Sequence, residues 1–216
     1  MLHYESWIPE SADDGSTVIV LMHGRGSDER DLLSLAPRFP EGTIVVAPRA
    51  PFPGAPWGYG PGWAWYRFIA DDMPEPESFA EGQRELREFV DRLPELLPIK
   101  PGSIAVGGFS QGGTMSLGFA LREPGRVSMA LNFSGFVPAH PSVVVTPETV
   151  KGTRFFWGHG TRDPSVPFEL AELGRAKLNA AGADLEARDY QIGHWIAPEE
   201  LEDAVRWMES EMNDDD

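Results

Sequence analysis

The sequence of 216 residues contains no cysteine, which excludes disulfide bonds, thiolate metal sites and a cysteine nucleophile. It also has no run of 18 or more apolar residues, so a membrane-spanning helix is not expected. The first residues lack the basic region and the apolar core of a secretory signal. We therefore expect a cytoplasmic protein without a membrane span.

Positive charge is scarce as well, with 18 basic residues against 34 acidic ones and a formal net charge of −16. Such a surface repels nucleic acid and anionic membranes, so neither is expected as a partner. Three of the 18 basic residues are lysines, which leaves 15 arginines. This acidic, lysine-poor composition is typical either of a salt-tolerant protein or of a GC-rich genome.

Short apolar runs alternate with amphipathic stretches along most of the chain. The expected strands span 17–22, 43–47, 103–106, 127–133, 153–157 and 185–191. The expected helices span 28–39, 78–97, 114–121, 168–181 and 198–212. Alternating strands and helices predict a three-layer α/β sandwich around a mostly parallel central sheet. No linker interrupts the pattern, so we expect one domain over residues 1–212 and an acidic, frayed tail at 213–216.

The stretch GGFSQGG, residues 107–113, places Ser110 between an expected strand and an expected helix. A serine on such a turn, in the pattern G-x-S-x-G, is typical of a nucleophile elbow. Glycines would permit a strained turn and a close approach of strand and helix. The alternatives are an ordinary glycine-rich turn or a phosphate-binding loop. Phe109 stands where a dinucleotide loop needs its second glycine, so the elbow is favoured.

A serine nucleophile needs a histidine base and an acid, and these follow the serine in the order acid, then histidine, in α/β-hydrolases. Two histidines after Ser110 follow expected strands, namely His159 and His194. Only His194 has an acid at a strand end between it and the serine, and that acid is Asp163. The prediction is therefore a triad of Ser110, Asp163 and His194. The alternatives are a turn aspartate, a loop histidine and a zinc site, although the spacings typical of zinc ligands are absent.

The oxyanion of an acyl-transfer intermediate needs two backbone donors near the serine. One is expected from Gln111, which follows the nucleophile, and the other from the loop after an early strand. His23-Gly24-Arg25 fits that loop, so the N–H of Arg25 is the second expected donor. The side chain of Arg25 receives no role from this pattern.

The segment from Pro48 to Pro76 is rich in proline and aromatic residues and is expected to be a long ordered loop, with a short strand near 63–66. As the longest loop predicted above the sheet, it is a candidate to cover the acyl chain of a substrate. The residues expected to line the pocket are Trp57, Trp63, Trp65 and Tyr66.

Six stretches resemble the phospholipase/carboxylesterase family, a group of small α/β-hydrolases without a large cap domain that includes acyl-protein thioesterases. They are LMHGRGSDERDLLSLA, PRAP, GWAWY, GGFSQGG, HGTRDPSVP and YQIGHWIAPEEL, and they occur in this order between about residues 22 and 208. The resemblance implies the triad and the oxyanion donors named above, and no cofactor or metal. Thioesterase members typically have an apolar residue at the position of Arg25 and a different aromatic segment at 50–69.

The expected function is that of a serine carboxylesterase that hydrolyses short- to medium-chain esters through an acyl-enzyme. Its partner would be a small-molecule ester, and the protein would be a monomer or a homodimer. Acyl thioesterase and lysophospholipase activities use the same chemistry and remain alternatives. A non-catalytic binding protein with a hydrolase fold is the alternative of a different class.

Overall fold

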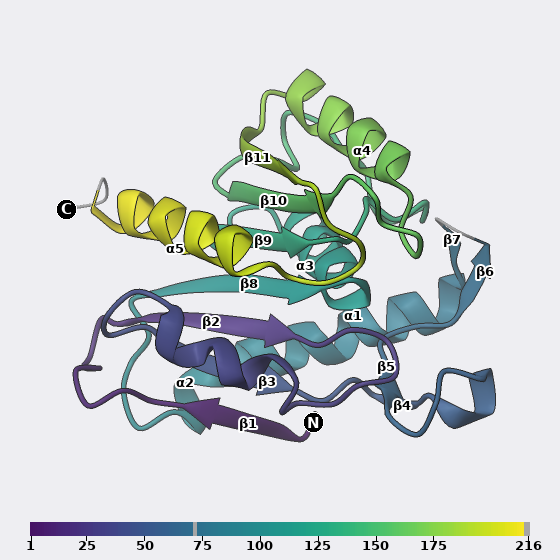
Figure 1. Cartoon of the computed structure of the whole chain (residues 1–216). Helices are drawn as coiled ribbons and strands as arrows, with labels where there is room; N and C mark the ends of the chain where they lie inside the picture. The colour runs from purple at the N-terminus through teal and green to yellow at the C-terminus, as the bar shows by residue number, and fades with distance from the viewer. Residues whose placement is uncertain (71–72, 214–216) are drawn as a thin grey trace.

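The computed structural model describes residues 1–70 and 73–213, and it is built around a seven-stranded sheet (Figure 1). The strand order is β1-β3-β2-β8-β9-β10-β11. The strands are β1 (Tyr4–Trp7), β2 (Thr17–Met22), β3 (Ile44–Pro48), β8 (Ser103–Phe109), β9 (Met129–Phe133), β10 (Arg154–Gly160) and β11 (Asp184–Tyr190). Strand β1 pairs antiparallel with β3, and the other neighbouring pairs are parallel. All carboxyl ends of the parallel strands therefore meet at one edge of the sheet.

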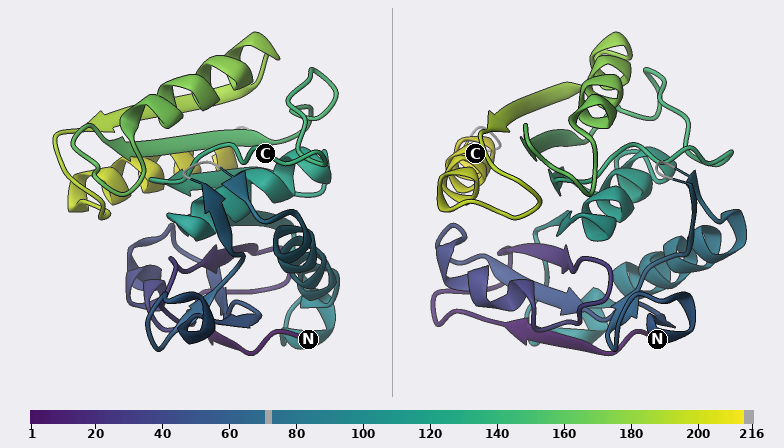
Figure 2. Two further views of the ribbon diagram at one scale, coloured as in Figure 1. Left: turned by 90° about the vertical axis from the view of Figure 1, so that its right-hand side faces the viewer. Right: turned by 45° about the vertical axis from the view of Figure 1, so that its right-hand side comes forward.

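Helices cover both faces of this sheet, and Figure 2 shows α1 and α5 on opposite sides of it. The helices are α1 (Pro76–Asp91), α2 (Leu93–Leu96), α3 (Gln111–Arg122), α4 (Phe168–Ala180) and α5 (Pro198–Asn213), with the 3₁₀ helices η1 (Leu32–Arg38) and η2 (Ala55–Trp57). One face packs on α1, α3 and α4, and the other packs on η1 and α5. The predicted three-layer α/β sandwich is thus confirmed.

The alternation of side chains along β2 produces the two cores. Val18 and Val20 face the core under α1 and α3, whereas Ile19 and Leu21 face the core under η1 and α5. Because both faces are covered, all six residues of β2 are buried. This explains why the strand reads as one apolar run rather than as alternating apolar and polar residues.

Several elements differ from the sequence-based expectation. The helix expected over 28–39 is the shorter 3₁₀ helix η1, which contains Pro37 and cannot continue a ladder of α-helical hydrogen bonds there. The helix expected over 78–97 is divided into α1 and α2, and Pro94 lies in the first turn of α2. Strand β1 was not expected, because its four residues gain their order from pairing with β3.

The aromatic segment forms small antiparallel pairs rather than a lone strand in a loop. These pairs are β4 (Phe52–Pro53) with β5 (Trp63–Ala64), and β6 (Phe68–Ala70) with β7 (Met73–Pro74). The described residues of this segment form no large cap over the sheet. Among the described helices, none is both long and apolar enough to cross a bilayer. Of the expected tail, Asn213 is the last residue of α5 and residues 214–216 lie outside the described part of the chain.

Candidate active site

The candidate site lies at the edge where the parallel strands end. Strand β8 ends immediately before Ser110, β10 ends shortly before Asp163, and His194 follows β11. This placement agrees with the general rule that ligands of parallel sheets bind beyond the carboxyl ends of the strands. Three residues that are 31 to 84 positions apart in the sequence are thereby brought together.

Ser110 occupies the sharp turn from β8 into α3, and its backbone has φ 55° and ψ −114°. A non-glycine residue rarely adopts a positive φ, so the strain of the turn lies on the serine itself. The backbone N–H of Ser110 donates to the carbonyl of Phe133, 2.8 Å away, which ties the turn to the end of β9.

The glycines on either side of Ser110, Gly108 and Gly112, allow α3 to pack closely against β2. A Cβ atom on Gly112 would collide with the carbonyl oxygen of Met22 in β2, and one on Gly108 would lie 2.5 Å from that same oxygen. Neither glycine has a positive φ. The pattern G-x-S-x-G therefore reflects the contact between α3 and the sheet, while the serine carries the unusual dihedral angle.

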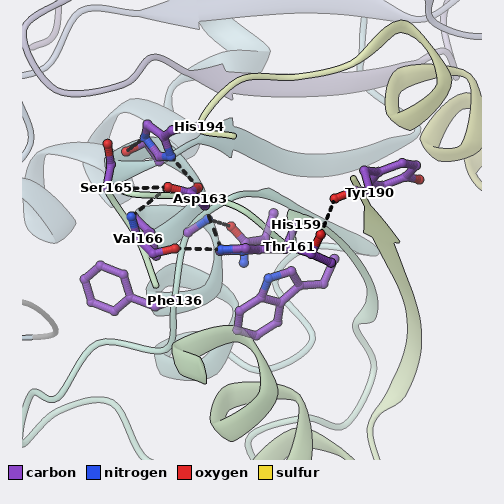
Figure 3. A network of polar contacts seen from close by, with 12 residues as sticks. Phe136, His159, Thr161, Asp163, Ser165, Val166, Tyr190 and His194 are labelled. Atoms are coloured by element: carbon purple, nitrogen blue, oxygen red, sulfur yellow. Dashed lines mark hydrogen bonds and ion pairs between the residues drawn. The ribbon is translucent and has the colours of Figure 1, made fainter. Parts of the chain in front are cut away.

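A chain of hydrogen bonds connects the three expected catalytic residues. The Nε2 atom of His194 lies 2.9 Å from the Oγ atom of Ser110, and its Nδ1 atom lies 2.6 Å from the Oδ2 atom of Asp163. Since a carboxylate can only accept, Nδ1 carries the proton and Nε2 is free to accept the proton of the serine hydroxyl. Figure 3 shows the imidazole of His194 next to the carboxylate of Asp163.

Asp163 is held as a carboxylate by several donors. The backbone N–H groups of Ser165 and Val166 donate to its Oδ1 atom at 2.8 and 2.9 Å. Burial alone would raise the pKa of Asp163, but the hydrogen bonds from His194, Val166 and Ser165 outweigh burial and lower the pKa below its usual value. The acid therefore stays ionised next to the imidazole that it orients.

His159 supports the same loop from below, as Figure 3 shows. Its ring is fully buried, and Nε2 lies 3.0 Å from the carbonyl oxygen of Val166 and 3.8 Å from the Oδ2 atom of Asp163. Burial lowers the pKa of His159, so the ring is neutral and donates from Nε2. His159, which has no acid between it and Ser110 at an expected strand end, is thus a structural neighbour of Asp163.

The loop after β2 places the second expected oxyanion donor next to the serine. Gly24 and Arg25 line the same cleft as Ser110. His23, buried beneath them, accepts from the N–H of Ala50 through Nε2 (3.1 Å) and donates through Nδ1 to the carbonyl of Gly24 (2.7 Å). Burial lowers the pKa of His23, which keeps its ring neutral and fixes the loop.

The other expected donor, Gln111, is the first residue of α3, where backbone N–H groups have no partner within the helix. Its side chain is buried and clamps the aromatic segment, because Oε1 accepts from the N–H of Trp65 and Nε2 donates to the carbonyl of Tyr66. This role of the Gln111 side chain was missed from the sequence, which carries no local signal for it.

The aromatic residues expected to line the pocket have different positions. Trp65 and Tyr66 are fully buried in the core, so the prediction that they contact a substrate is corrected. Trp57 and Trp63 are partly exposed but are not among the residues that line the cleft. Instead the segment holds the oxyanion loop, since the indole N–H of Trp65 donates to the carbonyl of His23 and the carbonyl of Trp63 accepts from Gly26.

The cleft beside the serine has a volume of about 440 Å³. Its described walls are Gly24, Arg25, Ser27, Asp31, Phe68, Ile69, Ala70, Phe109, Ser110, Ser165, Val166 and His194. A larger hollow of about 1000 Å³ lies at the opposite edge of the sheet, where the strands begin, and it contains none of the three expected catalytic residues. We assign the site to the smaller cleft because of the side chains that it gathers.

The described part of the chain contains no group of three or more histidine, aspartate or glutamate side chains arranged to hold a metal ion. Both ring nitrogens of His23 and of His194 are engaged by protein atoms. The geometry of these side chains therefore gives no support to the alternative of a zinc site.

The family of the chain follows from comparison with known proteins. The model of the Phospholipase/Carboxylesterase family matches residues 4–211, and the chain belongs to this family of hydrolases. A probable carboxylesterase of Oryza sativa subsp. japonica is 28% identical over 94% of this chain and 92% of its own length. An acyl-protein thioesterase 1 of Mycosarcoma maydis is 28% identical over 93% of each chain.

Solved structures agree with the family and the fold. The crystal structure of esterase PE8 has a TM-score of 0.80 and 28% identity, and the match covers 97% of this chain and 98% of that one. One relative, 27% identical over 90% of this chain and 84% of its own length, is named a probable inactive carboxylesterase of Oryza sativa subsp. japonica. Family membership alone therefore does not establish turnover, and the site geometry has to carry that step.

Proposed function

We propose that the protein is a serine carboxylesterase that hydrolyses short- to medium-chain carboxylic esters through an acyl-enzyme. The observation that carries the proposal is the continuous hydrogen-bonded chain from Ser110 through His194 to Asp163, which opens into a cleft. Relatives named carboxylesterase and a solved esterase of the same fold support the same reaction class.

In the first half of the reaction, the Oγ atom of Ser110 attacks the ester carbonyl carbon while Nε2 of His194 takes its proton. The carbonyl oxygen becomes an oxyanion and accepts from the N–H groups of Gln111 and Arg25. Asp163 holds the imidazole in the required tautomer and stabilises the imidazolium that forms. The intermediate then expels the alcohol, which takes the proton from His194 and leaves the acyl group on the serine.

In the second half, a water molecule attacks the acyl carbonyl while His194 again accepts a proton. The resulting intermediate releases the carboxylic acid, and the proton returns from His194 to Ser110. No cofactor is needed for this sequence. The described walls of the cleft are formed by loops, by β6 and by Phe109 at the end of β8, and this lining without a cap domain favours substrates with short acyl chains.

A thioesterase is the second candidate, because relatives named acyl-protein thioesterase 1 match nearly the whole chain. The same serine, base and oxyanion donors would cleave a thioester. Lysophospholipase activity would likewise use this site. The ratio of kcat/KM for a butyryl thioester to that for 4-nitrophenyl butyrate ranks the first two activities, and release of fatty acid from a lysophospholipid measures the third.

The experiment that tests catalysis itself is labelling with a fluorophosphonate probe. A serine hydrolase with this geometry reacts covalently at Ser110, whereas a non-catalytic binding protein does not react. Mass spectrometry of the labelled peptide should locate the adduct on residue 110. Absence of labelling in a folded protein would contradict the proposed function.

A further inference from the structure

The cleft contains one basic side chain that the reaction does not use, that of Arg25. Its guanidinium carbon lies 4.8 Å from the ring centroid of Tyr59 and 5.5 Å from that of Phe68, which is itself a wall residue. Apart from His194, it is the only residue able to carry a positive charge among the described residues that line the cleft. The charge of Arg25 thus lies next to Phe68, at the wall of the cleft that holds Ser110.

The two rings hold this guanidinium in place. The hydroxyl oxygen of Tyr59 accepts from the backbone N–H of Phe68 at 2.8 Å, so the rings are connected to each other. Gly26, next to Arg25, has φ +81°, and a Cβ atom there would collide with the carbonyl oxygen of Tyr59. An arginine stacked on aromatic faces keeps its N–H donors at the edge of the plane, where they remain available to an oxyanion.

Most arginines of this chain, such as Arg49 and Arg84, form ion pairs with carboxylates. Within residues 1–70 and 73–213, Arg25 has no carboxylate within the 4.0 Å that defines an ion pair. Among the described residues that line the cleft, Asp31 is the one with a carboxylate. Among the described residues of a chain with net charge −16, a positive charge without a carboxylate partner is most simply used to bind an anionic group of another molecule.

We infer that Arg25 selects esters that carry an anionic group, a carboxylate or a phosphate, so that the substrate class is anionic esters rather than neutral ones. This inference rests on the proposed esterase function and specifies its substrate. Arginine binds both anions through paired N–H donors. Asp31 would repel the same anion and so restrict it to the side of the cleft formed by Phe68.

The test compares esters that differ only in charge. The first pair places the anion on the acyl side and consists of the mono-4-nitrophenyl ester of adipic acid and 4-nitrophenyl hexanoate. The second pair places it on the alcohol side and consists of 4-(butyryloxy)benzoate and 4-(butyryloxy)benzamide. The measured quantity is the ratio of kcat/KM for the anionic ester to that for the neutral ester, which cancels any effect of a variant on the oxyanion hole.

We expect Arg25→Gln to lower this ratio about tenfold for at least one pair, and the responding pair identifies the side on which the anion lies. Arg25→Lys should retain most of the ratio, and Asp31→Asn should raise it. The matched control is Arg30→Gln, which removes the same charge from an exposed neighbour outside the cleft and should leave the ratio unchanged. The effect of Arg25→Gln should shrink in 1 M NaCl, where charges are screened over about 3 Å.

An Arg25→Gln variant that melts like the wild type and keeps both ratios unchanged would overturn the inference while leaving the esterase proposal intact. A fall in the ratio of equal size in Arg30→Gln would overturn it too, because the effect would then come from the net charge of the protein and not from a charge in the cleft. Failure of the wild type to hydrolyse any of the four esters or to react with the fluorophosphonate would instead overturn the proposed function.

Discussion

Ser110 and Ser134 share a positive φ but have different surroundings. Both have φ 55°, and they are the described non-glycine residues with a positive φ. Each follows a parallel strand and donates its N–H to a carbonyl oxygen of the neighbouring strand. Ser110 donates to Phe133 of β9 at 2.8 Å, and Ser134 donates to Gly158 of β10 at 3.0 Å. A residue with this rarely adopted φ thus follows both β8 and β9.

The side chains separate the two positions. The hydroxyl of Ser110 opens into the cleft and lies within hydrogen-bonding distance of His194, whereas Ser134 is fully buried and its hydroxyl has no hydrogen-bond partner in the described structure. Backbone strain therefore marks the ends of these strands in general and does not identify a nucleophile. A nucleophile is identified instead by the histidine base next to it and by its access to the cleft.

The largest expected effect comes from replacing the two serines in turn. Ser110→Ala should lower kcat/KM for 4-nitrophenyl butyrate by at least about ten-thousandfold and abolish fluorophosphonate labelling, because no other group can form the acyl-enzyme. Ser134→Ala removes a buried, unpaired hydroxyl and should keep both activity and labelling. Activity of Ser110→Ala within about a hundredfold of the wild type would remove the distinction between the two serines.

The second prediction concerns the acid that gives Ser110 its base. Asp163→Asn should lower kcat by about ten-thousandfold with little change in KM, since the imidazole loses the partner that fixes its tautomer. Glu169→Gln, in the first turn of α4, is the control with the same change of charge. Steady-state kinetics on both variants decide the point, and a larger loss in Glu169→Gln would mean that the acid is assigned wrongly.

The third prediction addresses another buried polar group, near Gly158, whose carbonyl accepts the N–H of Ser134. Glu200 is fully buried against Gly158, its Oε1 atom has no partner in the described structure, and burial raises its pKa to about 8. The folded protein thus keeps a proton that the unfolded chain loses above about pH 4.5. Stability associated with the neutral group is full below pH 4.5 and is lost as the pH rises through about 8.

Glu200→Gln should therefore raise the free energy of unfolding at pH 9 by on the order of 4 kcal/mol, with a much smaller gain at pH 5. Urea denaturation at the two pH values measures this difference. The exposed neighbour Glu199 provides the control, and Glu199→Gln should change little at either pH. Equal stability of Glu200→Gln and the wild type at pH 9 would show that the carboxyl is ionised in the folded state without penalty.

The hydrogen-bonded arrangement of Ser110, His194 and Asp163 could be expected from the sequence because its constraints are local and ordered. Ser110 and Asp163 follow apolar strands and His194 follows an alternating one, and a parallel sheet brings such positions to one edge whatever the details of packing. The supporting roles of His23 and His159 were not predicted. Both stand in a His-Gly pair at the carboxyl end of a strand, and that repeated pair is the signal that could have indicated their shared structural role.

The lining of the cleft could not be predicted, because burial of an aromatic ring is decided by residues distant in the sequence. Trp65 is buried through contacts with His23 and Gln111, which lie 42 and 46 residues away. In contrast, Phe68 and Ile69 of β6 border the cleft together with Ser110. The composition of the segment indicated an aromatic loop near the cleft but did not indicate which aromatic rings face the cleft.

The smallest expected effect concerns this lining and the length of the acyl chain. Ile69 is an exposed wall residue of the cleft, whereas Trp57 lies outside it. Each methylene covered by the wall contributes roughly 0.8 kcal/mol, so kcat/KM for 4-nitrophenyl esters should rise with chain length until the wall ends, at about two to eight carbons. Ile69→Ala should lower kcat/KM for the octanoate several-fold relative to the acetate, and Trp57→Ala should leave that ratio unchanged. A series of esters from two to sixteen carbons measures both. Fastest hydrolysis beyond twelve carbons would contradict the short cleft and favour lysophospholipase activity.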